Sequence, residues 1–221
     1  MSTSTETTEK IEALKELRRR MVEGRLLPPC EAPERLVFGE GSPNSRLAIV
    51  GEAPGEQEER QGRPFVGQAG QLLRRTLEEV GIDPDAVWIT NVVKCRPVSE
   101  AGGRRRINRA PARREGALWE PWLMEELRTL QPVAIVCLGN IAANSLIQKD
   151  FRMNRDRGKW FPSAIGVPAL ATFHPAYVLR QRHPQAQTVR QLFKDDLAEA
   201  KRKIEQANGP ARRAISYHRG R

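Results

Sequence analysis

The sequence predicts an α/β fold, a three-layer α/β/α sandwich with a mainly parallel central sheet. Short apolar runs typical of buried strands alternate with amphipathic segments typical of helices. Strands and helices in alternation favour parallel strands joined by helical crossovers. The chain has 221 residues and 39% hydrophobic content, which fits one domain with a substantial core.

The first half of the chain begins with a helix and then alternates. Apolar residues at helical spacing predict an amphipathic helix over about 6–24. Residues 46–51 (RLAIVG) form a short apolar run that leads directly into a turn rich in Gly and Pro. A helical pattern over 69–80 and a β-rich run over 86–93 follow. The expected order is therefore helix, strand, helix, strand.

The second half continues the alternation. Helical patterns cover 118–130 and 141–148, and the apolar runs at 132–138 and 167–173 are typical of buried strands. A closing helix is expected over 187–206. In such sheets ligands bind beyond the carboxyl ends of the strands, so the turns that follow the strands should gather at one functional edge.

The domain is expected to span 1–208, followed by a basic tail over 209–221 that is poor in apolar residues and that we expect to be mobile. No run of about 18 apolar residues exists, and the polar start of the chain lacks the apolar core of a signal peptide. The three cysteines are far apart and odd in number, which argues against a secreted disulfide scaffold. We expect a soluble, cytoplasmic monomer.

The formal charge of +10 and the pI of about 10.1 come mostly from arginine. The planar guanidinium binds phosphate through several donors, so nucleic acid is the first partner to test. A basic protein also binds acidic membranes or proteins, and charge alone leaves that choice open. Motifs must decide.

Three turns carry unusual residues, each with an alternative interpretation. The segment 51–70 is either a solvated loop or a site for water or a base; a phosphate cradle is disfavoured because its carboxylates would repel phosphate. His174 ends a predicted strand and precedes a proline, although a lone histidine is more often structural. Asn91 lies near the end of another predicted strand, where its amide would read a planar base edge, but alone it is weak evidence.

A fourth segment, 102–114 (GGRRRINRAPARR), is a run of arginines between glycines without apolar periodicity. It is either a disordered basic loop or a loop that docks on a DNA backbone, and both descriptions can hold together.

Taken together, GEAPGEQE, GRPFVGQAG, ITNVVKCRP and HPAYVLR, in this order, resemble the motif set of family-four uracil-DNA glycosylases. The resemblance runs from about Leu36 to the end of the closing helix. It implies an α/β/α sandwich that flips uracil out of DNA and hydrolyses its N-glycosidic bond, leaving an abasic site. The implied partners are uracil-containing and abasic DNA, without a membrane.

The resemblance also implies roles for individual residues. Glu52 is similar to the acidic residue that positions or activates water, and His174 to the histidine that donates to uracil O2. Phe65 resembles the aromatic residue that stacks on the flipped base, and Asn91 the amide that binds the N3 and O4 edge. Glu58 resembles the residue that crowds uracil C5 and excludes thymine. Ala53, next to Glu52, completes the expected uracil contacts.

The DNA-facing residues are implied in the same way. Val178 and Leu179 are the candidates for an apolar wedge in the vacated base stack, with Arg180 beside the backbone. The basic loop resembles the insertion of X-type glycosylases, in which a histidine becomes covalently trapped on the abasic sugar; this chain has Asn108 there. An amide is a poor nucleophile, so we expect turnover instead of trapping. Arg104, Arg105 and Arg106 of the loop are expected to contact phosphates, which would favour tight product binding.

Family-four enzymes carry an iron–sulfur cluster on four cysteines. Here Cys95 alone matches clearly, Cys30 has no CxxC partner, and the last ligand position falls at Trp119. Cys137 lies inside a predicted strand. Since such clusters usually take four thiolates, we predict that this chain has no iron–sulfur cluster and needs no metal. Two rival functions remain: a protein that binds and shields uracil or abasic sites with little turnover, and a protein that crosslinks through another loop residue.

Overall fold

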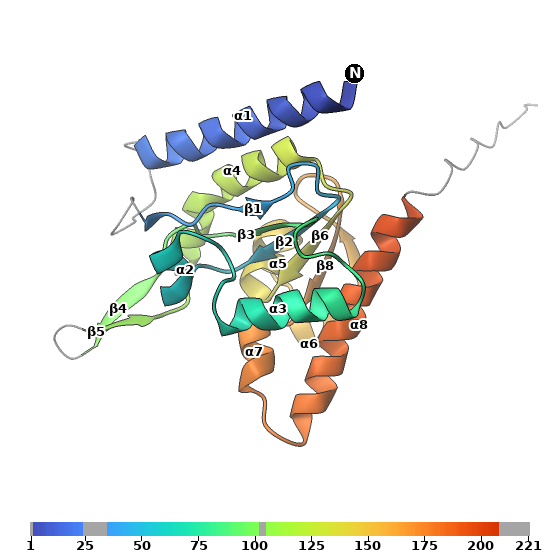
Figure 1. Ribbon diagram of the computed structural model, residues 1–221. Coiled ribbons are helices and arrows are strands. Elements are labelled where there is room, and N and C mark those ends of the chain that lie inside the picture. The colour runs from blue at the N-terminus through green and yellow to red at the C-terminus, as the bar shows by residue number, and fades with distance from the viewer. Residues whose placement is uncertain (1, 24–34, 102–104, 208–221) are drawn as a thin grey trace, which may run out of the picture.

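A six-stranded sheet runs through the middle of the computed structural model, which describes residues 2–23, 35–101 and 105–207 (Figure 1). The strand order is β1-β3-β2-β6-β8-β7. In that order the strands are Glu40–Gly41, Trp88–Asn91, Leu47–Gly51, Ala134–Leu138, Pro168–Thr172 and Trp160–Pro162. Within the described residues, no helix is long and apolar enough to cross a membrane.

The four central strands are parallel to one another. β2 pairs with β3 and with β6, and β6 pairs with β8, all in parallel register. Only the short outer strands β1 and β7 run antiparallel to their neighbours. The predicted fold class is therefore confirmed, and the carboxyl ends of β3, β2, β6 and β8 meet along one edge.

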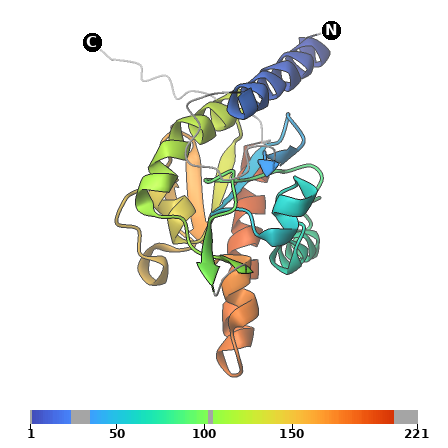
Figure 2. The same cartoon turned by 90° about the vertical axis from the view of Figure 1, so that its left-hand side faces the viewer.

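Helices cover both faces of the sheet (Figure 2). On one face α1 (Ser2–Glu23) packs on α4 (Arg113–Leu130), and α5 (Asn140–Leu146) contacts the sheet. On the other face lie α3 (Gln68–Glu79) and α8 (Gln185–Gln206). Successive strand residues point to opposite faces. The sheet thus contributes to two separate cores, one under each helical layer.

Most predicted elements appear with shifted ends. The first helix begins at Ser2, before the predicted residue 6, and α4 begins at Arg113, five residues before the predicted 118. The earlier start of α4 has a local cause, because the Glu115 carboxylate accepts the Ala112 N–H at 2.6 Å and satisfies one backbone donor at the helix end.

The arginine-rich segment is partly a hairpin, which corrects the expectation of an irregular loop. β4 (Val98–Ala101) pairs antiparallel with β5 (Arg105–Asn108), and the hairpin projects from the body of the protein (Figure 1). Strand pairing uses backbone groups, so an arginine-rich composition did not reveal it. Residues 102–104, which include Arg104, and the predicted tail at 209–221 lie outside the described residues.

Candidate active site

Three predicted site residues follow parallel strands at the same edge of the sheet. Asn91 ends β3, Glu52 follows β2, and His174 follows β8 by two residues. Two backbone hydrogen bonds join the first two turns: the N–H groups of Val92 and Val93 donate to the carbonyls of Gly51 and Glu52 at 2.9 and 3.0 Å. The turns that carry Asn91 and Glu52 therefore form one rigid unit.

Asn91 presents a buried acceptor at this edge. The side chain is 2% exposed, and among the described residues its Oδ1 has no hydrogen-bond partner. A buried unpaired polar atom costs about 1–3 kcal/mol, which makes it a candidate ligand contact. A Cβ on Gly51 would lie 2.4 Å from Asn91 Oδ1 and 2.5 Å from Cζ of Phe65. Only glycine therefore leaves both the amide and the ring edge in place.

Phe65 is held in a strained backbone conformation. Its φ of 53° lies in the left-handed region, which side chains other than glycine rarely adopt and which marks functional sites. The two N–H groups after it, of Val66 and Gly67, donate to Glu58 Oε1 at 3.0 and 2.8 Å, and Gly55 N–H donates to Glu58 Oε2 at 3.2 Å. Glu58 thus fixes the backbone on both sides of α2 (Glu56–Gln61) and holds the Phe65 turn.

His174 is the N-cap of α7 (Pro175–Arg180), and its ring is neutral. Its Nδ1 accepts the N–H of Ala176 at 3.2 Å, so the remaining ring proton is on Nε2. Burial, together with the positive charge of Arg180, lowers the pKa of His174 to about 4. The ring centroids of His174 and Phe65 are 5.9 Å apart. The site therefore combines an aromatic ring with a neutral N–H donor.

Glu52 lies in a partly buried position directly after β2. Burial raises the pKa of its carboxyl group, and the Arg180 charge works against that shift. Arg180 acts electrostatically on both Glu52 and His174, so it belongs to the same site as well as to the surface. Ala53, partly buried, packs against the core on the α4 side of the sheet.

A buried ion pair that no sequence pattern indicated supports the Asn91 turn. Lys94 and Glu126 are both fully buried, and Lys94 Nζ donates to Glu126 Oε2 at 2.5 Å. The same ammonium donates to Thr90 Oγ1 at 2.6 Å and to the Asn91 carbonyl at 2.8 Å, while Trp88 Nε1 donates to Glu126 Oε1 at 2.9 Å. Charged residues 32 positions apart give no joint signal in a sequence.

The basic hairpin is attached to the site through α2. Arg96 donates to Glu59 at 3.1 Å and to Asn108 Oδ1 at 2.6 Å, and Arg106 donates to Glu59 at 3.3 Å. The anchoring Arg96 and Glu59 side chains are 6% and 7% exposed. A Cβ on Gly55 would lie 3.5 Å from Asn108 Nδ2, so the Asn108 amide sits at the rim of the site.

The predicted wedge needs a correction. Val178 is 3% exposed and packs in the core with α3 and α8, so it cannot enter a DNA stack. Leu179 is 39% exposed and remains the candidate. Tyr177, 41% exposed and stacked on Phe173 at 5.2 Å, lies on the same short helix and was not singled out from the sequence.

The described residues do not supply the ligand set of an iron–sulfur cluster. Cys95 is buried at one of the four family positions, but Trp119 fills the expected last position in the α4 core. Cys137 is buried in β6, where burial raises the pKa of its thiol and disfavours the thiolate that a metal needs. Among the described residues no three His, Cys, Asp or Glu side chains group as metal ligands; Cys30 lies outside them. That the chain has no cluster remains a prediction.

Comparisons with known proteins agree with this geometry. The family model described as the uracil DNA glycosylase superfamily matches residues 38–198. A type-4 uracil-DNA glycosylase of Thermotoga maritima is 38% identical over 167 residues, covering 75% of this chain and 81% of that protein. Type-4 uracil-DNA glycosylases of Pyrobaculum aerophilum and Sulfurisphaera tokodaii are 39% and 35% identical, covering 73% and 83% of this chain and 80% of each relative.

The matched region contains the whole parallel sheet core and all three strand-end residues, Glu52, Asn91 and His174. The model match covers more than half of the chain, and the relatives exceed 30% identity over most of their own length. The chain therefore belongs to the uracil-DNA glycosylase superfamily.

Proposed function

We propose that this protein is a monofunctional uracil-DNA glycosylase, which flips uracil out of DNA and hydrolyses its N-glycosidic bond in base excision repair. The observation that carries the proposal is the buried, unpaired Asn91 Oδ1 beside the Phe65 ring. The type-4 relatives support it, since each is a uracil-DNA glycosylase by name.

Base recognition follows from the Asn91 amide. Uracil offers an N3–H donor and an O4 acceptor, which match Oδ1 and the Nδ2 donor of the amide. Cytosine offers the opposite pattern on this edge, an acceptor at N3 and a donor at N4. Because the Asn91 side chain is almost fully buried, a mismatched base would leave polar groups unpaired without water to replace them. Phe65 supplies the face on which the flipped base stacks, and Glu58 crowds C5, where thymine carries its methyl group.

Bond cleavage places negative charge on uracil and positive charge on the sugar. The neutral His174 donates its Nε2–H to uracil O2, and a preorganised donor of this kind contributes about 3–4 kcal/mol to the barrier reduction. Glu52, as the carboxylate, stabilises the oxocarbenium-like sugar and orients or deprotonates the attacking water. The leaving uracil anion takes up a proton, and water oxygen forms the new bond to C1′.

DNA is bound by residues around the site. Leu179 fills the gap that the flipped base leaves, while Arg180 and the arginines of the basic loop, Arg105 and Arg106, contact phosphates. Asn108 is held by Arg96 and has no imidazole to attack the abasic sugar, which supports turnover over covalent trapping. The proposal extends to tight product binding, because phosphate contacts persist after the base has left. It also includes that the protein is a monomer and is cytoplasmic.

The direct test is a uracil-containing oligonucleotide, scored by alkali-labile cleavage, with Glu52→Gln as the matched variant. We expect cleavage by the native protein and a fall of about 10²–10⁴-fold in kcat for the variant. A protein that binds abasic DNA tightly but leaves no alkali-labile site would be a binding module instead. A protein–DNA band that survives denaturing electrophoresis would instead indicate the trapping function.

A further inference from the structure

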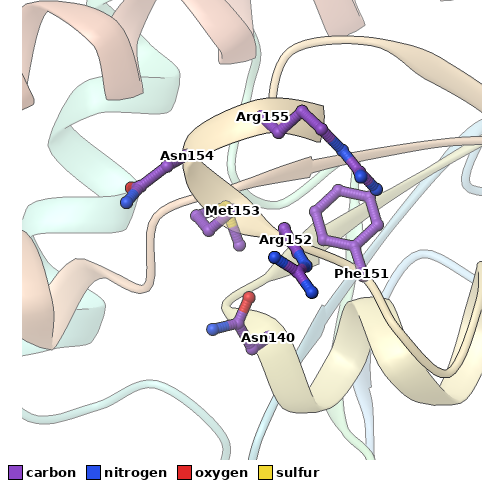
Figure 3. A pocket seen from close by; sticks show the side chains of 6 residues that line it. All are labelled: Asn140, Phe151, Arg152, Met153, Asn154 and Arg155. Carbon is purple, nitrogen blue, oxygen red and sulfur yellow. The ribbon is translucent and has the colours of Figure 1, made fainter.

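Close to His174 of the proposed uracil site lies a hollow in the surface. Its volume is about 550 Å³, and the residues that line it are Asn140, Phe151, Arg152, Met153, Asn154 and Arg155 (Figure 3). They come from the start of α5 and from α6 (Met153–Asp156) with the turn before it. None of these residues was singled out in the sequence.

The hollow is a direct neighbour of His174. Asn140 follows Gly139, whose N–H donates to the Thr172 carbonyl at 2.9 Å, and a Cβ on Gly139 would lie 3.3 Å from His174 Cβ. Asn140 is the first residue of α5, which follows β6, and β6 lies between β2 and β8 in the sheet. Neighbouring strands of a sheet lie about 4.8 Å apart. Asn140 therefore lies about one strand away from each of the two strands that lead to Glu52 and His174.

The lining is rich in donors and has an unbalanced positive charge. Arg155 donates to Asp156 at 2.7 and 2.8 Å, an arrangement that lowers the pKa of Asp156 to about 2 and balances that arginine. Arg152 is exposed, and within the part of the chain that the structure describes its guanidinium makes no hydrogen bond or ion pair. In Figure 3 its side chain and that of Asn140 extend toward the same space.

The aromatic residue of the hollow is not available to a base. Phe151 is 5% exposed and packs edge-on against Phe161, with ring centroids 5.7 Å apart. A nucleobase would therefore find no face to stack on, whereas an anion would find the Arg152 guanidinium and the Asn140 amide, and no carboxylate is among the lining residues.

We propose that this hollow binds a backbone phosphate of the DNA strand, close to the flipped nucleotide, with Arg152 as the charged contact and Asn140 as a neutral donor. This inference rests on the proposed function. It completes a pattern along the sheet edge, because the arginine hairpin follows β3 at one side of the site, while Arg152 precedes α6, which contacts β8 at the other side. DNA that spans both would have the uracil site at its centre.

The test uses the full chain, uracil-containing and abasic duplex DNA, and the variant Arg152→Gln. Arg128→Gln is the matched control, because Arg128 is an exposed arginine in the last turn of α4, which leads to the amino ends of the strands, away from the site. We expect Arg152→Gln to reduce the slope of log Kd for abasic DNA against log salt by about 1. KM for uracil DNA should rise about 3- to 10-fold near 0.1 M salt, with kcat unchanged.

Asn140→Ala should raise KM less and leave the salt slope unchanged, because it removes no charge. If Arg152→Gln has the slope and KM of the native protein, or if Arg128→Gln changes them equally, the phosphate site is wrong. Failure of the proposed function has a different signature, since the native protein would then excise no uracil at all.

Discussion

The residues that face the base and the residues that face the DNA backbone differ in burial and in what holds them. Asn91 is 2% exposed, and the fully buried Lys94–Glu126 pair fixes its turn. Leu179 is 39% exposed on a six-residue helix, and the hairpin is attached through a few arginine contacts. We therefore propose that the buried interior reads the base and that the exposed rim binds the DNA polymer. Changes in the interior should therefore lower kcat, and changes at the rim should alter KM.

Among the residues that support or surround the site, the largest effect is expected from the buried pair. The double variant K94M/E126Q removes both charges, so no uncompensated charge remains buried. The amide introduced at position 126 can still form hydrogen bonds with Trp88 and Thr90. What disappears are the Lys94 hydrogen bonds to Thr90 Oγ1 and, at the recognition turn, to the Asn91 carbonyl. We expect kcat on uracil to fall about 10- to 100-fold, because small misplacements of a recognition group are costly.

A double-mutant cycle separates positioning from general damage. If Lys94 acts through Asn91, then K94M/E126Q should cause little further loss of kcat in a protein that already carries Asn91→Ala. Additive losses in the cycle would instead assign the pair a purely structural role.

The pH dependence should come from Glu52. Burial raises the pKa of its carboxyl group. As the pH is lowered, kcat/KM should therefore begin to decrease above the ordinary titration range of glutamate, because the carboxylate becomes protonated. His174, with a pKa of about 4, stays neutral above pH 5 and should add no limb there. Arg180→Gln removes a charge that lowers the Glu52 pKa, so the acidic limb should move to higher pH.

The measurement is kcat/KM between pH 4 and 9 for the native protein, Arg180→Gln and His174→Gln. A limb near pH 6.5 that vanishes in His174→Gln would mean that the histidine titrates during catalysis, contrary to the neutral donor described above.

The smallest effect is expected at the rim, where two adjacent residues provide a matched comparison. Leu179→Ala should lower kcat/KM on duplex uracil by about tenfold, less at a U·G mismatch, and hardly at all on single strands, because only a stacked base must be replaced. Its unfolding free energy should be unchanged. Val178→Ala should do the reverse, losing about 1–3 kcal/mol of stability with normal kinetics, because Val178 is in the core.

Urea unfolding and steady-state kinetics on the two variants check this comparison. Equal kinetic losses in both would return Val178 to the DNA interface and contradict its burial.

The sequence was informative where chemistry and strand ends coincide. Apolar runs that end near Glu52, Asn91 and His174 predicted the sheet and the edge that joins these residues, because parallel strands gather their carboxyl ends. It was uninformative where a contact joins distant polar residues. Lys94 and Glu126 each read as ordinary surface charges until the fold brings them together.

Two other features were hidden for local reasons. Adjacent apolar residues such as Val178 and Leu179 do not reveal which one faces the core when the helix has only six residues. Arg152 lies in a short turn with no motif around it, so only the hollow shows that its charge lies next to the site.

The central claim is that the Asn91 amide reads the N3 and O4 edge of uracil, and methylation of one atom tests it. Excision of uracil and of 3-methyluracil is compared in single-stranded oligonucleotides for the native protein and for Asn91→Ala. The native protein should lose at least about 10²-fold in kcat/KM on the methylated base, because its N3–H donor is gone and the buried Asn91 oxygen meets a methyl group. Asn91→Ala should treat both bases nearly alike. Equal excision of the two bases by the native protein would contradict the account.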